Sequence, residues 1–123
     1  MGQNKSKNRY SDAELEEFRD LIEQKLKAAR EQLEFYLEQI AETADSEDAK
    51  IKGLDDGVTT IERERLTTMA GRQKKLIQHL ENALLRIENK VYGICRVTGK
   101  LIPKERLRAV PHATLSVEAK EKR

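Results

Sequence analysis

The chain has 123 residues, of which 37% are hydrophobic, 37% charged and only 4% aromatic, and its formal net charge is +2. This composition is poor material for a compact globular core, and it suits long helices that each bury one stripe. No apolar run approaches the roughly 20 residues of a membrane span. The N-terminus shows no secretory signal, and one cysteine excludes an internal disulfide framework. We therefore expect a cytoplasmic protein with one domain and an extended element.

Charge is divided unevenly along the chain. Residues 1–57 carry 9 basic and 15 acidic residues, whereas residues 58–123 carry 15 basic and 7 acidic residues. The simpler interpretation is that two halves of opposite sign attract each other in the fold. The alternative is a basic surface in the second half that meets an anion or a nucleic acid.

A first helix is expected after a disordered tail at residues 1–10. The stretch SDAE is a capping box, with Glu14 three places after Ser11. Apolar side chains then recur at steps of three and four, which places them on one helical face. They are Leu15, Phe18, Ile22, Leu26, Ala29, Leu33, Tyr36 and Ile40.

A second helix is expected from Thr59, where TTIE forms another capping box with Glu62. Its stripe has one polar member, Gln73, and Gly93 is expected to end it. The stripe consists of Leu66, Met69, Gln73, Leu76, Leu80, Leu84, Ile87 and Val91.

The two helices are expected to form an antiparallel coiled-coil hairpin over residues 11–91. They have similar lengths and matching apolar stripes, and the connection at about residues 44–58 is acidic and contains two glycines. About thirty helical residues at about 1.5 Å each predict an arm on the order of 45 Å long with an acidic tip. A plain dimerising coiled coil with an inert tip is the alternative.

Residues 92–123 predict a small globular region. The stretch ICRVTGKLIP looks like two short strands around a Thr98–Gly99 turn. KERLRAV predicts a helical turn, and TLSVEAKEKR predicts a short terminal helix. The expected fold class is therefore mainly α, with a β-hairpin confined to this region.

The same region carries a recognisable motif. It begins with Y-G-x-C and continues through a turn glycine to an R-L-x-A-x-P-x-A segment, at Tyr92, Gly93, Cys95, Gly99, Arg106, Leu107, Ala109, Pro111, Ala113 and Leu115. These residues resemble the C-terminal region of the DksA/TraR family of bacterial transcription regulators. A long helical hairpin before a zinc-finger-like region is also the plan of that family, so the resemblance covers nearly the whole chain.

The family carries four cysteines as C-x2-C-x17-C-x2-C. Here those places fall on Cys95, Thr98, Ser116 and Ala119, so three thiolates are missing. Structural zinc takes four sulfur or nitrogen ligands. We therefore expect no metal and no other cofactor, with half a site from Cys95 and His112 as the alternative. Packing is expected to replace the metal, by Ile94, Val97, Leu101, Ile102, Leu107, Val110, Leu115 and Val117.

The resemblance implies a mechanism. Members of the family bind RNA polymerase and insert the coiled-coil tip into its secondary channel to modulate initiation. The tip motif of the family, D-x-x-D-x-A, is not present here in register. Asp55 and Asp56 are favoured as the polymerase-contacting carboxylates, with Asp45 and Asp48 as alternates. A solvated acidic turn without a partner is the other interpretation.

The resemblance also implies a surface for the alarmone ppGpp. The matching positions are Arg72, Lys75, Leu76, His79, Arg106 and Lys120. Clustered Arg and Lys side chains suit a pyrophosphate group. Ordinary helix-surface charge is the alternative.

No enzymatic activity and no catalytic residue are expected. The sequence has no phosphate loop, no paired Glu/His metal motif and no triad, and Cys95 is interpreted as a buried structural thiol. Two other functions stay open, a nucleic-acid-binding module that uses the basic C-terminal third and a self-associating coiled-coil scaffold. A homodimer is left open, whereas neither a membrane partner nor sequence-specific DNA binding is expected.

Overall fold

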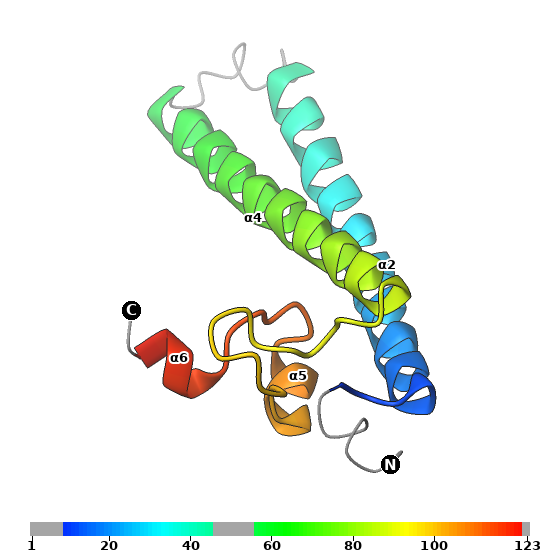
Figure 1. The fold of residues 1–123 in the computed structure, drawn as a ribbon. Coiled ribbons are helices and arrows are strands. Elements are labelled where there is room, and N and C mark those ends of the chain that lie inside the picture. Colours follow the sequence, from blue (N-terminus) through cyan, green and yellow to red (C-terminus); the bar gives the residue numbers. More distant parts are fainter. Residues whose placement is uncertain (1–8, 46–55, 122–123) are drawn as a thin grey trace, which may run out of the picture. The chain divides into compact units, whose positions relative to one another are not determined.

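The structure is a computed structural model that describes residues 9–45 and 56–121, without the side chains of residues 44, 45, 56–59, 118 and 121. In this part of the chain the helices are α2 (Asp12–Asp45), α4 (Asp56–Glu88), α5 (Lys104–Ala109) and α6 (Val117–Glu121) (Figure 1). The mainly α fold class is thereby confirmed. The expected β-hairpin is reduced, among the described residues, to an isolated antiparallel bridge between Ile94 and Leu101.

The chain divides into two compact units, and each contains a piece of both long helices. The knuckle unit comprises Met1–Leu26 and Gln78–Arg123, and the arm unit comprises Lys27–Ile77. In each unit a segment of α2 packs against a segment of α4, so the two helices pair as a hairpin. None of the described helices is both long enough and apolar enough to cross a membrane.

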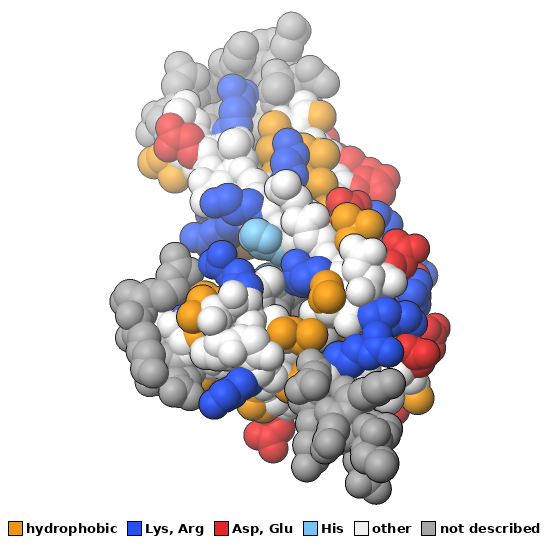
Figure 2. All heavy atoms as spheres, viewed as in Figure 1, with side chains coloured by type: hydrophobic (Ala, Val, Ile, Leu, Met, Phe, Trp, Pro, Cys, Tyr) orange, Lys and Arg blue, Asp and Glu red, His pale blue; other side chains and the backbone are white. Residues whose placement is uncertain are grey.

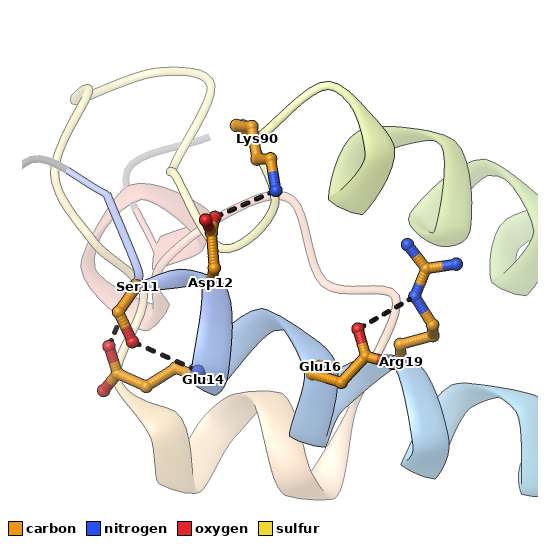
Figure 3. A network of polar contacts seen from close by, with 6 residues as sticks. All are labelled: Ser11, Asp12, Glu14, Glu16, Arg19 and Lys90. Atoms are coloured by element: carbon orange, nitrogen blue, oxygen red, sulfur yellow. Dashed lines mark hydrogen bonds and ion pairs between the residues drawn. The ribbon is translucent and has the colours of Figure 1, made fainter.

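The first turn of α2 has the capping box that the sequence predicts. The N–H of Ser11 donates to Oε1 of Glu14 at 2.9 Å, and the N–H of Glu14 donates to Oγ of Ser11 at 3.1 Å (Figure 3). Both bonds satisfy N–H groups that have no partner within the helix. Next to the box, Lys90 pairs with Asp12 at 2.9 Å and so ties the start of α2 to the chain that follows α4.

The beginning of α4 differs from the prediction. The helix begins at Asp56, upstream of the expected cap at Thr59. Thr59 therefore lies inside the helix and is not its N-cap. Glu62 accepts hydrogen bonds from the guanidinium group of Arg65 at 2.9 and 3.3 Å, which forms an (i, i+3) ion pair on an exposed helix surface.

The end of α4 also differs from the prediction, because it does not depend on Gly93. The N–H of Val91 donates to the carbonyl of Arg86 at 2.9 Å, and the N–H of Lys90 donates to the carbonyl of Ile87 at 3.0 Å. Lys90 lies in the left-handed region with a φ of 63°. This is a Schellman motif, which closes the last carbonyls of a helix.

The predicted stripes supply the core of both units. On α2 the buried members are Leu15, Phe18, Ile22, Leu26 and Ala29. On α4 the buried members of the stripe are Leu66, Leu80 and Ile87. Two alanines that the sequence analysis did not include, Ala70 and Ala83, are also buried, whereas Val91 is 46% exposed. Small alanine side chains allow two helices to approach closely.

An aromatic cluster fills the core of the knuckle unit. Phe18 lies between two tyrosines, with its ring centroid 5.8 Å from that of Tyr10 and 5.4 Å from that of Tyr92. The Tyr10 hydroxyl donates to the carbonyl of Ile102, and the Tyr92 hydroxyl donates to the carbonyl of Pro111 at 2.8 Å. Tyr10, which the sequence placed in the N-terminal tail, is therefore a buried part of this unit.

The apolar residues that were expected to pack the C-terminal region at residues 92–123 do so only in part. Ile102, Leu107 and Leu115 are buried. Val97 and Val117 are 63% and 50% exposed, which makes the prediction wrong for these two. Four residues of this region that were not predicted as packing residues are buried, namely Tyr92, Cys95, Ala113 and Ala119.

Candidate functional site

The acidic tip that the sequence predicts lies outside the described side chains. Asp48 and Asp55 fall within residues 46–55, and Asp45 and Asp56 belong to helix ends of which only the backbone is described. The contribution of these four carboxylates therefore stays a prediction.

A cavity of about 260 Å³ lies in the knuckle unit. Its walls come from α4, α5, α6 and the segment before α6, and consist of His79, Asn82, Arg86, Arg106, His112, Ala113, Thr114, Leu115 and Lys120. Lys and Arg side chains lie beside a histidine on the face of the molecule shown in Figure 2. The described lining combines two guanidinium groups, one ammonium group and two imidazoles, and includes no carboxylate. We call it the basic cavity.

Helix α4 supplies one wall of the basic cavity through helical spacing. His79, Asn82 and Arg86 follow each other at steps of three and four, so they share one face of the helix. His79 and Asn82 are exposed, whereas Arg86 is half-buried. The wall therefore offers donors both at the rim and deeper in the cavity.

Two arginines hold the segment that forms the opposite wall. Nε of Arg106 donates to the carbonyl of Leu115 at 2.8 Å. Nη2 of Arg86 donates to the carbonyl of His112 at 3.4 Å. A guanidinium group has five N–H donors in a fixed fork, so each arginine keeps further donors for a ligand.

The rings of His79 and His112 stack on each other. Their centroids lie 5.4 Å apart and their planes are inclined by 7°. His112 is half-buried, and its Nδ1 atom is buried without a hydrogen bond to any described residue. A buried polar atom without a partner costs stability, so Nδ1 is a group that a ligand or a water molecule can satisfy.

The cavity resists additional positive charge. Burial lowers the pKa of Arg86, and the nearby hydroxyl of Tyr92 offsets this only in part. Burial also lowers the pKa of His112, and the neighbouring His79 and Arg86 lower it further. Desolvation and neighbouring like charges both disfavour a further positive charge in the cavity. The same surroundings favour a bound anion.

The structure brings together half of the predicted ppGpp surface. The residues that line the basic cavity are His79, Arg106 and Lys120. The other three belong to the arm unit and are Arg72, Lys75 and Leu76. Arg72 and Lys75 are exposed and Leu76 is half-buried, so the grouping of these three with the cavity stays a prediction.

The sequence analysis missed Arg86 and His112 as cavity residues. Arg86 stands two helical turns after His79, so the helical spacing alone could have identified it. His112 reaches the cavity from a loop far along the chain, and only the packing of that loop against α4 brings the two rings together. No local sequence pattern predicts this contact.

Hydrogen bonds connect the four positions at which the family carries cysteine, namely Cys95, Thr98, Ser116 and Ala119. The N–H of Ser116 donates to Sγ of Cys95 at 3.4 Å, and the N–H of Ala119 donates to Oγ of Ser116 at 3.1 Å, which caps α6. A hydrogen bond from the Thr98 side chain is the largest cause that lowers the pKa of the Cys95 thiol to about 6, and burial opposes this shift. Cys95 is only 1% exposed.

Known proteins resemble this chain in sequence and structure. Residues 90–123 match the prokaryotic dksA/traR C4-type zinc finger. General stress protein 16O of Bacillus subtilis is 30% identical over 98 residues, which are 80% of this chain and 59% of that protein. The RNA polymerase-binding transcription factor DksA of Caulobacter vibrioides is 51% identical over 51 residues, which are 42% of this chain and 36% of that protein. The chain thus spans less than two thirds of the curated relatives that it matches.

The match to a C4-type zinc finger contradicts the prediction that the chain has no cofactor, because it indicates a zinc-binding family. Of the four positions only Cys95 carries a thiol, and the described residues contain no group of three or more His, Cys, Asp or Glu side chains that could hold a metal ion. Four-coordinate structural zinc needs four such ligands, so the residues present do not fit the metal of the family.

The overall architecture agrees with the motif. The solved structure of transcription factor DksA2 from Pseudomonas aeruginosa matches with a TM-score of 0.81 and 29% sequence identity, over 89% of this chain and 82% of that chain. The likeness therefore includes the helical hairpin as well as the C-terminal region. The motif at residues 90–123, the hairpin and this structural match agree, and the chain belongs to the DksA/TraR family.

Proposed function

We propose that the chain is a transcription regulator that binds RNA polymerase. The observation that carries the proposal is the structural likeness to transcription factor DksA2 over 89% of the chain. The sequence likeness to a Caulobacter protein named as RNA polymerase-binding supports it, with 51% identity over 51 residues. Binding to polymerase would place the chain in the cytoplasm. The proposal assigns the chain no catalytic activity.

In this proposal the hairpin enters the secondary channel of the polymerase. Helices α2 and α4 have 34 and 33 residues, which makes each of them about 50 Å long at about 1.5 Å per residue. A narrow helical pair of this length suits a channel. Carboxylates at its tip would approach the catalytic Mg²⁺ and change its electrostatic environment. Asp55 and Asp56 are proposed for this role, with Asp45 and Asp48 as alternates.

The proposal also makes the basic cavity a binding site for ppGpp. His79, Arg106 and Lys120 line the cavity together, as a ligand with clustered phosphates requires. Arginine forms paired, charge-assisted hydrogen bonds with phosphate oxygens, and lysine adds a mobile positive charge. Three residues of the arm unit stay part of the proposed surface on the basis of the resemblance, namely Arg72, Lys75 and Leu76.

The proposal is tested with purified bacterial RNA polymerase. The native chain, the tip variant Asp55→Ala/Asp56→Ala and a control that removes two exposed carboxylates of α2, Glu23→Ala/Glu31→Ala, are compared. Affinity for polymerase and the lifetime of promoter complexes are measured for each. The native chain and the control are expected to bind and to change the lifetime. The tip variant is expected to bind without this effect.

Other outcomes identify the alternatives. If the tip variant still regulates, Asp45 and Asp48 become the candidates. If a folded sample does not bind polymerase at all, the proposal is wrong. DNA binding without polymerase that weakens steeply with salt would then favour the nucleic-acid-binding module. A size that grows with protein concentration would favour the self-associating scaffold or a homodimer.

A further inference from the structure

We propose that the imidazole of His112, which stacks on His79, takes up a proton when a doubly charged phosphate group enters the basic cavity, so that affinity for the anion rises as the pH falls. This inference rests on the proposed ppGpp site and deepens it. It adds His112 and Arg86 to the residues that bind the ligand, and it makes binding dependent on pH.

The described groups that line the cavity around the histidine pair carry positive charge or none. Arg86 lies on α4 with the neutral Asn82, Arg106 lies on α5, and Lys120 lies on α6. Among the described residues that line the cavity none carries a carboxylate. The other titratable group nearby is the Tyr92 hydroxyl, which interacts with Arg86. Among its described residues the cavity lining thus provides no counterion for a protonated imidazole.

Without a bound anion, the cavity therefore disfavours a further positive charge beside the two rings. With ring centroids 5.4 Å apart, two imidazolium ions would repel each other. Burial, His79 and Arg86 all hold the pKa of His112 below its usual value.

A dianion in the cavity reverses this balance. Opposite charge within a few ångströms favours the protonated imidazole and raises its pKa. Linkage then requires that the ligand binds more tightly at a pH where the ring is protonated. Affinity for the anion is therefore lowest when His112 is neutral, increases as the pH falls through the pKa of His112 in the liganded state, and levels off below its pKa in the free state. One unit of pKa change corresponds to about tenfold in affinity.

The geometry of His112 supplies a donor for the ligand. Nδ1 is buried and makes no hydrogen bond to the described residues. In the imidazolium form both ring nitrogens are donors. A phosphate or sulfate oxygen in the cavity would satisfy Nδ1 and benefit from its charge. Because this hydrogen bond requires a bound anion, the ring gains its proton when the ligand binds and not before.

The test uses sulfate as the first probe, because it stays a dianion throughout the range, whereas a phosphate monoester gains a proton near about pH 6. The ring protons of both histidines in the full chain are followed by NMR from about pH 8 to about pH 5.5, with and without sulfate and at constant ionic strength. Sulfate is expected to raise the pKa of His112 by about one unit, and its dissociation constant is expected to fall about tenfold over this range. Pyrophosphate and ppGpp are then titrated in the same way.

Three variants locate the proton. His112→Gln keeps a hydrogen-bonding side chain without titration, and it is expected to flatten the pH dependence. His79→Lys provides a fixed charge, and it is expected to strengthen binding at high pH and to flatten the curve. Lys100→Gln removes an exposed cation that does not line the cavity, and it is expected to retain the native profile. Circular dichroism confirms that each variant is folded.

The possible failures are distinguishable. Binding of sulfate and ppGpp that does not change with pH overturns the inference and leaves the ppGpp site intact. A native pH profile in His112→Gln also overturns it, because the proton must then be bound elsewhere. If none of the anions binds the folded chain at any pH, both the inference and the proposed ppGpp site are wrong. Polymerase binding is measured separately and is unaffected by any of these results.

Discussion

The ring of Tyr10 lies so close to Gly93 that a β-carbon on Gly93 would stand 2.6 Å from Cε2 of that ring. Gly93 also has a φ of +80°, a backbone conformation that side chains with a β-carbon rarely adopt. The same tyrosine contacts Phe18 and donates its hydroxyl hydrogen to the carbonyl of Ile102. Tyr10 thereby packs the start of α2 against residues 92–123, and Gly93 leaves the space that its ring occupies.

Replacement of Gly93 by alanine is predicted to weaken the knuckle unit strongly. The new methyl group meets Tyr10 at 2.6 Å and Leu107 at 3.2 Å, and the positive φ adds strain. We expect the free energy of unfolding to fall by about 2 to 4 kcal/mol, measured by urea denaturation.

A matched control separates the contact from the backbone strain. Gly99 has a similar φ of +75°, but a β-carbon there would meet nothing within 4 Å. Gly99→Ala is therefore expected to cost only about 1 kcal/mol. Equal losses in the two variants would show that the contact between Tyr10 and Gly93 contributes nothing.

The protein is predicted to lose stability at alkaline pH through its buried tyrosines. Burial raises the pKa of Tyr92 and of Tyr10. A group whose pKa is raised in the folded state contributes its full stability below the unfolded-state pKa of about 10, and this contribution is lost as the pH rises beyond it. Tyr92→Phe removes one titrating group, so its stability should decline less steeply above about pH 10. Parallel pH profiles for the two proteins would contradict this assignment.

The capping box at the start of α2 is predicted to stabilise the fold measurably. Ser11→Ala removes the hydroxyl that accepts from the N–H of Glu14. A loss of about 1 kcal/mol is expected from thermal or urea unfolding. Thr60→Ala serves as the control, since Thr60 is exposed within α4 and its replacement should be nearly neutral. If both substitutions change stability equally, the cap is not the cause.

The thiol of Cys95 is predicted to ionise at an unusually low pH because of Thr98. The hydrogen bond from the Thr98 side chain is the largest cause that lowers the pKa of Cys95 to about 6. Thr98→Val should raise this pKa, and Thr98→Ser, which keeps the hydroxyl, should preserve it. The ultraviolet absorbance of the thiolate as a function of pH measures both.

The lowered pKa of Cys95 also predicts a pH dependence of stability. Because the folded-state pKa is lowered to about 6, its contribution is fully present above the unfolded-state pKa of about 8.5 and is lost as the pH falls through the folded value. Thr98→Val should therefore show a weaker decline in stability between these two pH values. Identical thiolate titrations in Thr98→Val and Thr98→Ser would contradict the role of the hydroxyl.

Helical periodicity predicted the long helices well because it is a local property. The apolar side chains from Leu15 to Ala29 recur at steps of three and four, and the members of that stripe are buried. The box at Ser11 was also correct, since its two partners are three residues apart. The box at Thr59 was wrong, because α4 begins at Asp56 and Thr59 therefore lies inside the helix.

The knuckle and its cavity could be predicted only in part from the sequence. Apolar character alone did not distinguish the buried Leu107 from the exposed Val97, because only the folded loop decides which side chain faces inward. The stack of His79 on His112 likewise joins distant parts of the chain. The family resemblance identified three of the nine described residues that line the cavity, and the three-dimensional structure was needed for the rest.

The central claim, a regulator whose hairpin tip reaches the active centre of RNA polymerase, is tested most directly by mapping the bound chain. The catalytic Mg²⁺ is replaced by Fe²⁺, and hydroxyl radicals formed there cleave whatever backbone lies nearby. Cleavage is predicted within about residues 45 to 57, between α2 and α4. Binding to polymerase without cleavage in this segment, or with cleavage only in the C-terminal region at residues 92–123, would contradict the account.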